Sequence, residues 1–281
     1  MRSYEPPLDI LGFHRNRGIK MHGLIQWVFI GLAWSVAVSA TDLAREQRIH
    51  AELEGFVLVG ESITLKGGGN EFLAIHTAAS TPKALGGVIL AHGRGANPDW
   101  NDVIQPLRIG LPEHGWETLS LQMPLAAADA APDAYEALIP EAFPRLTAAS
   151  EMLNQQGTRN QVVIGHSLGA RMVVGWLAQD PPPSVRAGVL VGLAVGPDEA
   201  GTLKALERIK IPLLDIYGSR DLDSVMDSAP ARAAAARRGG NPDYRQLEIA
   251  GADHFFRGQE TLLLARVRAW LARVAAIAPP G

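Results

Sequence analysis

Three residue types that together activate a serine nucleophile occur in this chain in the order serine, aspartate, histidine. Ser167 lies in the pattern Gly165-His166-Ser167-Leu168-Gly169, and Asp221 and His254 follow it. A serine hydroxyl is a weak nucleophile unless a neighbouring base removes its proton, and an imidazole oriented by a carboxylate is such a base. The three residues predict nucleophilic catalysis at Ser167, with His254 as the base and Asp221 as the acid that orients it.

The residues around Ser167 predict a strand, a sharp turn and a helix. The apolar, β-branched run 161–164 leads into the Gly-x-Ser-x-Gly pattern, and apolar residues then recur at helical spacing as far as Leu177. Gly165 and Gly169 would let the strand and the helix approach closely. This arrangement is a nucleophile elbow, in which the strained serine exposes its Oγ and the helix N-terminus faces any anion formed beside it.

The tetrahedral intermediate of acyl transfer carries an oxyanion, which needs two preset N–H donors. The expected donors are the backbone N–H groups of Leu168, next to the nucleophile, and of Arg94, in the loop His92-Gly93-Arg94-Gly95. The residues expected to support the site are His92, Gly93, Gly165, His166 and Gly169.

Other carboxylates near the ends of predicted strands are alternatives to Asp221 as the acid. They are Asp223, and Asp198 or Glu199 after the preceding strand. Asp215 falls inside a predicted strand and is interpreted as structural, and Asp253 as part of a solvated turn. His76, which lies within a strand pattern, is interpreted as a surface or packed residue rather than the base.

Short apolar runs alternate with helical patterns, which predicts a mostly parallel sheet with helices on both faces. The expected strands are residues 56–59, 72–76, 87–91, 116–123, 161–164, 187–195, 213–217 and 244–250, the first two forming an antiparallel pair. The expected helices begin near residues 100, 144, 168, 203, 229 and 263, the first of them capped by Asp99. Residues at the carboxyl ends of these strands should share one edge of the sheet, where such folds bind ligands.

Residues 1–40 have the composition of a secretory signal. Arg15, Arg17 and Lys20 precede the apolar stretch 24–38, and small residues then lead to polar Thr41. That stretch is shorter than the roughly 20 residues of a membrane span, although an uncleaved anchor or a buried helix are alternatives. We expect one domain at 41–281 in a periplasmic or secreted protein, with membrane attachment only through an uncleaved N-terminal segment.

The composition excludes several classes of function. The chain has no cysteine, which excludes disulfides, thiol catalysis and thiolate metal sites. Its net charge of −3, without a long basic run, indicates no nucleic-acid partner. No metal-ligand cluster or nucleotide-binding motif occurs, so no metal and no cofactor are expected.

Four motifs resemble those of the α/β-hydrolase superfamily, and they occur in its order. They are His92-Gly93-Arg94-Gly95, the elbow, Tyr217-Gly218-Ser219-Arg220-Asp221 and Ala252-Asp253-His254. The resemblance spans the chain after residue 40 and looks most like an uncharacterised bacterial exported branch. It implies the α/β-hydrolase fold and the Ser-Asp-His roles given above. The short connection 195–202 predicts little or no cap domain, so any lid should come from the Ala/Pro-rich segment 124–144.

The predicted function is that of a carboxylesterase acting on small-molecule or polymer-borne esters. Thioesterase, peptidase and acyltransferase activities use the same triad, and the alternative is a non-catalytic protein of this fold with an envelope binding or assembly role. Four arginines are expected near the site mouth: Arg94, Arg171, Arg220 and Arg257. They would favour anionic or polar acyl substrates unless they form ordinary salt bridges.

Overall fold

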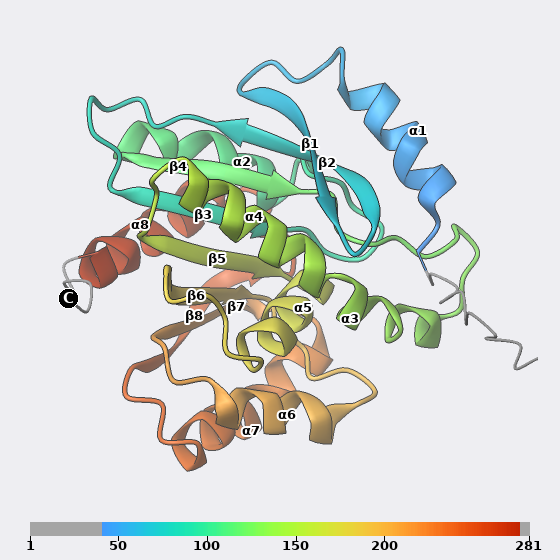
Figure 1. Ribbon diagram of the computed structural model, residues 1–281. Coiled ribbons are helices and arrows are strands. Elements are labelled where there is room, and N and C mark those ends of the chain that lie inside the picture. The colour runs from blue at the N-terminus through green and yellow to red at the C-terminus, as the bar shows by residue number, and fades with distance from the viewer. Residues whose placement is uncertain (1–40, 276–281) are drawn as a thin grey trace, which may run out of the picture. The chain divides into compact units, whose positions relative to one another are not determined.

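An eight-stranded sheet with strand order β1-β2-β4-β3-β5-β6-β7-β8 organises the computed structural model (Figure 1). The structure describes residues 41–275, which belong to the unit Ser39–Gly281. The predicted signal segment 1–40 lies outside the described residues. Within 41–275, no helix has the length and apolar character needed to cross a membrane.

Most of the sheet is parallel. From β4 through β3, β5, β6 and β7 to β8, neighbouring strands pair in parallel, whereas β2 is antiparallel to both β1 and β4. The strands are β1 (Glu61–Gly67), β2 (Asn70–Thr77), β3 (Gly86–Ala91), β4 (Trp116–Leu121), β5 (Gln161–His166), β6 (Val185–Val191), β7 (Leu213–Arg220) and β8 (Tyr244–Asp253).

Helices cover both faces of the sheet, as the alternation of strands and helices predicted. The helices are α1 (Leu43–Leu53), α2 (Ile104–Gly110), α3 (Leu138–Glu141), α4 (Phe143–Gln155), α5 (Leu168–Leu177), α6 (Glu199–Arg208), α7 (Asp223–Arg238) and α8 (Glu260–Ala275), with 3₁₀ turns at Pro112–His114 and Pro132–Tyr135. Figure 1 shows α4 and α5 in front of the sheet and α2 and α8 behind it.

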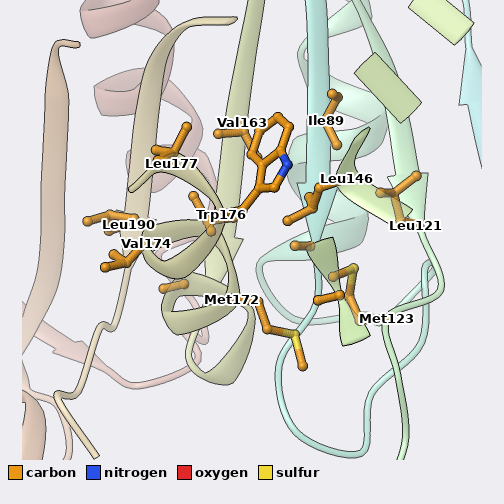
Figure 2. Packing of buried hydrophobic residues seen from close by; sticks show 14 of the residues in the cluster. Ile89, Leu121, Met123, Leu146, Val163, Met172, Val174, Trp176, Leu177 and Leu190 are labelled. Atoms are coloured by element: carbon orange, nitrogen blue, oxygen red, sulfur yellow. The ribbon is translucent and has the colours of Figure 1, made fainter. Parts of the chain in front are cut away.

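Two apolar cores lie on opposite faces of the sheet because successive side chains of a strand point to opposite sides. Ile89 of β3 and Val163 of β5 pack with residues of α4 and α5 in one core. Figure 2 shows Trp176 of α5 beside Val163 in this cluster. Val88 and Val162, their neighbours in sequence, pack with residues of α2 and α8 in the other core. The wholly apolar strand runs are thus explained by burial on both faces.

The sequence prediction of a strand at 56–59 was wrong. Phe56 and Leu58 are 77% and 96% exposed in the connection that follows α1. The antiparallel pair is formed instead by β1 and β2, which are joined at Gly67↔Asn70. Gly68 and Gly69 between them have φ values of +61° and +84°, which glycine adopts readily.

Three further boundaries differ from the prediction. The helix expected near residue 100 begins at Ile104, after Val103, whose φ of +56° is not helical. Asp99 accepts hydrogen bonds from Arg108 instead of capping this helix. The strand expected at 187–195 ends at Val191, because Gly192 has a φ of +59° and turns the chain away. The helix expected near residue 229 begins six residues earlier, at Asp223. The remaining strands and helices occur within about four residues of their expected positions.

The topology brings the chemistry-bearing residues to one edge of the sheet. The chain passes from β3 to β4 on one side and then returns to β5 on the other, so the connections leaving β3 and β5 diverge. Such a switch point is where open α/β sheets bind ligands. The loop 92–95 follows β3 and Ser167 follows β5 at this point, while Asp221 and His254 follow β7 and β8.

A buried polar cluster ties together the elements that carry the acid and the base. The Arg232 guanidinium of α7 donates to both carboxylate oxygens of Asp215 on β7, at 2.7 and 3.2 Å, and both residues are fully buried. The hydroxyl of Tyr244 and the amide of Gln246, both on β8, donate to the same carboxylate. Asp215 therefore has the structural role expected of a residue inside a strand.

Candidate active site

Ser167 occupies the turn between β5 and α5 in a strained backbone conformation. Its φ and ψ are +55° and −117°, in a region that residues with a side chain rarely adopt. The turn is tight because a Cβ on Gly165 would lie 2.4 Å from the carbonyl oxygen of Gly169, and one on Gly169 would lie 2.3 Å from that of Ala91. The two glycines therefore permit the close packing of strand and helix that presents Ser167.

A line of two hydrogen bonds joins the serine, the histidine and the aspartate. His254 Nε2 lies 2.9 Å from Ser167 Oγ, and His254 Nδ1 lies 2.6 Å from Asp221 Oδ1. Because the carboxylate only accepts, Nδ1–H donates to it, which leaves Nε2 to accept the serine proton. Ser167 is half-buried, while His254 and Asp221 are buried.

The surroundings of Asp221 keep its carboxylate ionised. Burial alone would raise the pKa of Asp221, but the hydrogen bond and charge of His254 and the backbone N–H groups of Leu222 and Gly218 outweigh it, so the pKa lies below its ordinary value. Those N–H groups donate at 2.8 and 3.3 Å. The carboxylate can thus hold the imidazole in one tautomer and stabilise the imidazolium.

Gly192, at the end of β6, leaves space for the imidazole of His254. A Cβ at position 192 would lie 3.0 Å from both Cε1 and Nδ1 of His254, and 3.5 Å from Asp221 Oδ2. The positive φ of Gly192 adds a second reason for glycine. Gly192 is not among the site residues expected from the sequence, although a glycine that closes an apolar strand at the ligand-binding edge is a usable signal.

His166 supports the backbone of the base. Its Nε2–H donates to the carbonyl oxygen of His254 at 3.0 Å, and the two rings lie 5.0 Å apart. Burial, and after it the positive charge of a protonated His254, lower the pKa of His166 to about 4. His166 is therefore neutral at physiological pH and acts as a fixed hydrogen-bond donor.

The loop after β3 packs directly against the nucleophile. A Cβ on Gly93 would lie 3.1 Å from Ser167 Cβ and 3.3 Å from His166 Nδ1, so only glycine fits without displacement. Among residues 41–275, the backbone N–H groups of Arg94 and Leu168 have no hydrogen-bond acceptor. Two unengaged N–H donors that flank a strained serine can bind an oxyanion.

His92 orients the first of these donors. Its Nδ1–H donates to the Gly93 carbonyl oxygen at 2.8 Å, while its Nε2 accepts from the backbone N–H of Met123 at 2.9 Å. The Gly93–Arg94 peptide is trans, so holding its carbonyl oxygen on one side aims the Arg94 N–H to the other. Burial lowers the pKa of His92 to about 4, which keeps the ring in this neutral tautomer.

The segment 124–144 packs beside the site. The Tyr135 ring lies under the guanidinium of Arg94, 4.5 Å from it. Glu136 forms a bidentate pair with Arg171 of α5 at 2.5 and 2.6 Å. With Gly175 and Thr202, Glu136 and Arg171 line a groove of about 610 Å³ between α3, α5 and α6. Neither contact was identified from the sequence, because both join side chains that lie far apart in the chain.

The alternative acids and the alternative base lie in other environments. Asp198 caps α6 by accepting from the Gly201 N–H, and Asp253 accepts from the N–H groups of its own turn. Asp223 and Glu199 are exposed. His76 lies within β2 and pairs with Glu117 at 2.9 Å. Among residues 41–275, no group of histidines and carboxylates could hold a metal ion.

Comparisons with known proteins agree with this architecture. Residues 38–143 and 132–273 match a protein family described as "Protein of unknown function (DUF3530)". The chain belongs to this family. A comparison of the DUF3530 chain with curated proteins finds no match.

Solved structures with this fold include several esterases. Est1E from Butyrivibrio proteoclasticus has a TM-score of 0.61 at 14% identity, over 76% of this chain and 99% of Est1E. The esterase Pf2001 from Pyrococcus furiosus has a TM-score of 0.60 at 17% identity, covering 76% and 92% of the two chains. Dienelactone hydrolase from Anabaena variabilis has a TM-score of 0.57 at 19% identity, covering 76% and 96%. The DUF3530 chain therefore has the α/β-hydrolase fold.

Proposed function

We propose that this chain is a serine hydrolase that cleaves carboxylic esters through an acyl-enzyme on Ser167. The observation that carries the proposal is the hydrogen-bonded line from Ser167 Oγ through His254 to Asp221. The unengaged N–H groups of Arg94 and Leu168 beside Ser167 supply the oxyanion donors that acyl transfer needs. Loss of one such donor typically lowers the rate by about 10²–10³-fold.

The reaction uses the site in two steps. Ser167 Oγ attacks the ester carbonyl while His254 Nε2 takes its proton, and the tetrahedral intermediate collapses as His254 returns that proton to the leaving alcohol. Water then attacks the acyl-enzyme with the same proton transfers, releasing the carboxylic acid and restoring Ser167. Asp221 stays ionised throughout, consistent with the direction of its pKa shift.

The structural neighbours favour esters over amides and thioesters as the substrate class. Est1E and Pf2001 are named as esterases, and one structure of Est1E, with a TM-score of 0.64, contains ferulic acid. Their identity to this chain is below 20%, so they support the reaction class and do not identify a substrate.

An active-site probe tests the proposal directly. We expect a fluorophosphonate to label the wild-type protein and Ser224→Ala, whose exposed serine lies on α7, but not Ser167→Ala. Hydrolysis of short 4-nitrophenyl esters should fall at least about 10⁴-fold in Ser167→Ala. A folded wild-type protein that is neither labelled nor active would favour the non-catalytic alternative. Faster turnover of amides than of matched esters would contradict the esterase assignment.

We also propose that the chain is exported, with residues 1–40 removed as a signal. The proposal rests on the composition of that segment and on the anchoring of Thr41 in the folded domain. Thr41 is buried, its Oγ1 accepts from the Leu125 N–H at 2.8 Å, and its own N–H donates to Glu141 at 3.2 Å. N-terminal sequencing of the protein from a periplasmic extract should begin at Thr41. Recovery of the full chain in the cytoplasmic fraction alone would contradict export.

A further inference from the structure

Two of the four arginines expected near the site mouth are ion-paired, and a third is hydrogen-bonded to backbone. Arg171 is held by Glu136, and Arg257 pairs with Asp102 at 3.2 Å. The Nε of Arg220 donates to a backbone carbonyl at 2.8 Å. The charges of Arg171 and Arg257 are therefore compensated by carboxylates, and the Nε and Nη2 of Arg220 are already engaged by a carbonyl oxygen.

Arg94 differs from the other three. It is exposed, and it makes no ion pair and no hydrogen bond with any residue among 41–275. Its guanidinium lies over the buried ring of Tyr135, 4.5 Å from the centroid. Stacking fixes the plane of a guanidinium and leaves its N–H groups free to donate at the edge.

The backbone of Arg94 lies next to Ser167, and its side chain reaches Tyr135. Its backbone follows Gly93, which packs against Ser167, and its N–H is the candidate oxyanion donor. Tyr135 is adjacent in sequence to Glu136, which binds α5 one turn beyond Ser167. The Arg94 side chain therefore extends from the oxyanion loop to the segment 124–144 along the rim of the site.

A second cation, Arg45, borders the same loop, and among residues 41–275 it forms no ion pair. Arg45 Nη2 lies 3.8 Å from where a Cβ of Gly95 would be, and its Nη1 donates to the Ala126 carbonyl oxygen at 2.8 Å. Glu46, next to Arg45 in the chain, pairs with Arg145, and Glu136 pairs with Arg171. Asp42 caps α1 by accepting from the backbone N–H of Arg45. Within the described part of the chain, neither the Arg45 nor the Arg94 guanidinium forms an ion pair, so both remain available to an anion.

We propose that Arg94 is a specificity-determining residue, and that the preferred substrates are esters carrying a second, carboxylate group. A planar guanidinium held by Tyr135 can bind a carboxylate through two parallel hydrogen bonds while the ester carbonyl lies at Ser167. The inference rests on the proposed function, and it leaves open only whether the acyl or the alcohol part carries the charge.

Matched pairs of substrates separate these two sources. For the acyl part, mono-4-nitrophenyl adipate is compared with its neutral methyl ester. For the alcohol part, 5-acetoxy-2-nitrobenzoate is compared with its methyl ester. One of the two pairs carries its carboxylate on the part of the ester that Arg94 contacts. For that pair, we expect wild-type kcat/KM for the anionic substrate to exceed that for the neutral substrate by about tenfold.

The variants are compared by this anionic-to-neutral ratio, which cancels any change in the chemistry shared by both substrates. Arg94→Gln should bring the ratio to about one, and Arg94→Lys should retain part of it. Tyr135→Leu should lower the ratio, whereas Tyr135→Phe, which keeps the ring, should preserve it. The control Arg159→Gln removes an exposed charge in the loop before β5, at the opposite edge of the sheet, and should leave the ratio unchanged.

Failure of this inference can be distinguished from failure of the hydrolase proposal. One contrary result is ester hydrolysis with an anionic-to-neutral ratio near one for both substrate pairs, and another is a ratio that Arg94→Gln does not change. Either result would overturn the role of Arg94 and leave the hydrolase proposal intact. If the protein hydrolyses nothing, binding to Ser167→Ala still tests the inference. Ligand-observed NMR should show that monomethyl adipate binds more tightly than dimethyl adipate, and that Arg94→Gln abolishes the difference. Equal binding of the two ligands would overturn it.

Discussion

His92 acts on the candidate site without touching Ser167. Its Nδ1–H holds the carbonyl oxygen of Gly93, and its Nε2 is fixed by the N–H of Met123. The imidazole thus links the end of β4 to the peptide whose N–H faces the expected oxyanion. A neutral histidine suits this position because it offers one donor and one acceptor in a fixed geometry.

Replacing His92 should impair catalysis more than substrate binding. We expect His92→Leu to lower kcat for 4-nitrophenyl esters by about 10²-fold with a small change in KM, because a misdirected Arg94 N–H weakens only the oxyanion interaction. His92→Asn should restore part of the loss, since its amide can donate to the Gly93 carbonyl. The measurement is steady-state kinetics, with thermal unfolding to establish that both variants fold. A loss confined to KM would contradict this role.

The residues of the candidate triad could be predicted because each lies in a short motif next to a recognisable strand. Ser167 is flanked by the two glycines that its turn requires, and His254 follows an alternating strand pattern. Gly192 and Tyr135 could not be assigned in this way. Gly192 is needed because of the imidazole of His254, and Tyr135 lies beside Arg94 only through the path of the segment 124–144.

At the scale of elements, α1 is attached to the site region by a buried ion pair. The Glu46 carboxylate receives hydrogen bonds from Arg145 of α4 at 2.8 and 3.1 Å, and both side chains are at most 5% exposed. Arg145 also donates to the Gln122 carbonyl oxygen, and Glu46 accepts from the Leu125 N–H. The chain after β4, which leads to the segment beside Arg94, is therefore held by α1.

We expect Glu46→Gln to destabilise the fold by about 3 kcal/mol, because it leaves the buried charge of Arg145 without its counter-ion. Glu52→Gln, at an exposed position of the same helix, is the matched control and should change stability by less than about 0.5 kcal/mol. Urea unfolding followed by circular dichroism measures both. Equal, small effects would show that the Glu46–Arg145 ion pair contributes little to stability.

The predicted elements were most accurate where strands are buried on both faces, and least accurate at the N-terminal edge of the sheet. A continuous apolar run such as 87–91 or 161–164 can be buried on both faces only in a central strand of the sheet. By contrast, residues 56–59 are as apolar as a strand but are largely exposed, and the hairpin forms from the more polar β1. Pairing at an edge depends on turn geometry and on the neighbouring strand more than on local hydrophobicity.

At the scale of the whole molecule, two buried histidines predict acid sensitivity. The pKa values of His92 and His166 are lowered from 6.5 to about 4 by burial. In the unfolded chain, each of these histidines binds a proton near pH 6.5. In the folded chain, each does so only near pH 4. Their contribution to stability is therefore complete above pH 6.5 and declines as the pH falls towards 4.

As the pH falls from 7 to 5, we expect each of these histidines to lower the free energy of unfolding by about 2 kcal/mol. Asp221, whose pKa lies below its ordinary value, adds a loss at still lower pH. The measurement is the free energy of unfolding in urea between pH 7.5 and 4.5. His166→Gln should remove about one proton from the pH dependence. A wild-type stability that is flat across this interval would contradict the neutral, buried state of both rings.

Gly192 also limits where a carboxylate could be placed in this chain. A carboxylate at the end of β6 would require a side chain at or near the point where the imidazole ring already fills the available volume. Moving the acid there in one mutational step would displace the base before the new acid could help it. A side chain at position 192 would therefore disturb the hydrogen-bonded line of Ser167, His254 and Asp221.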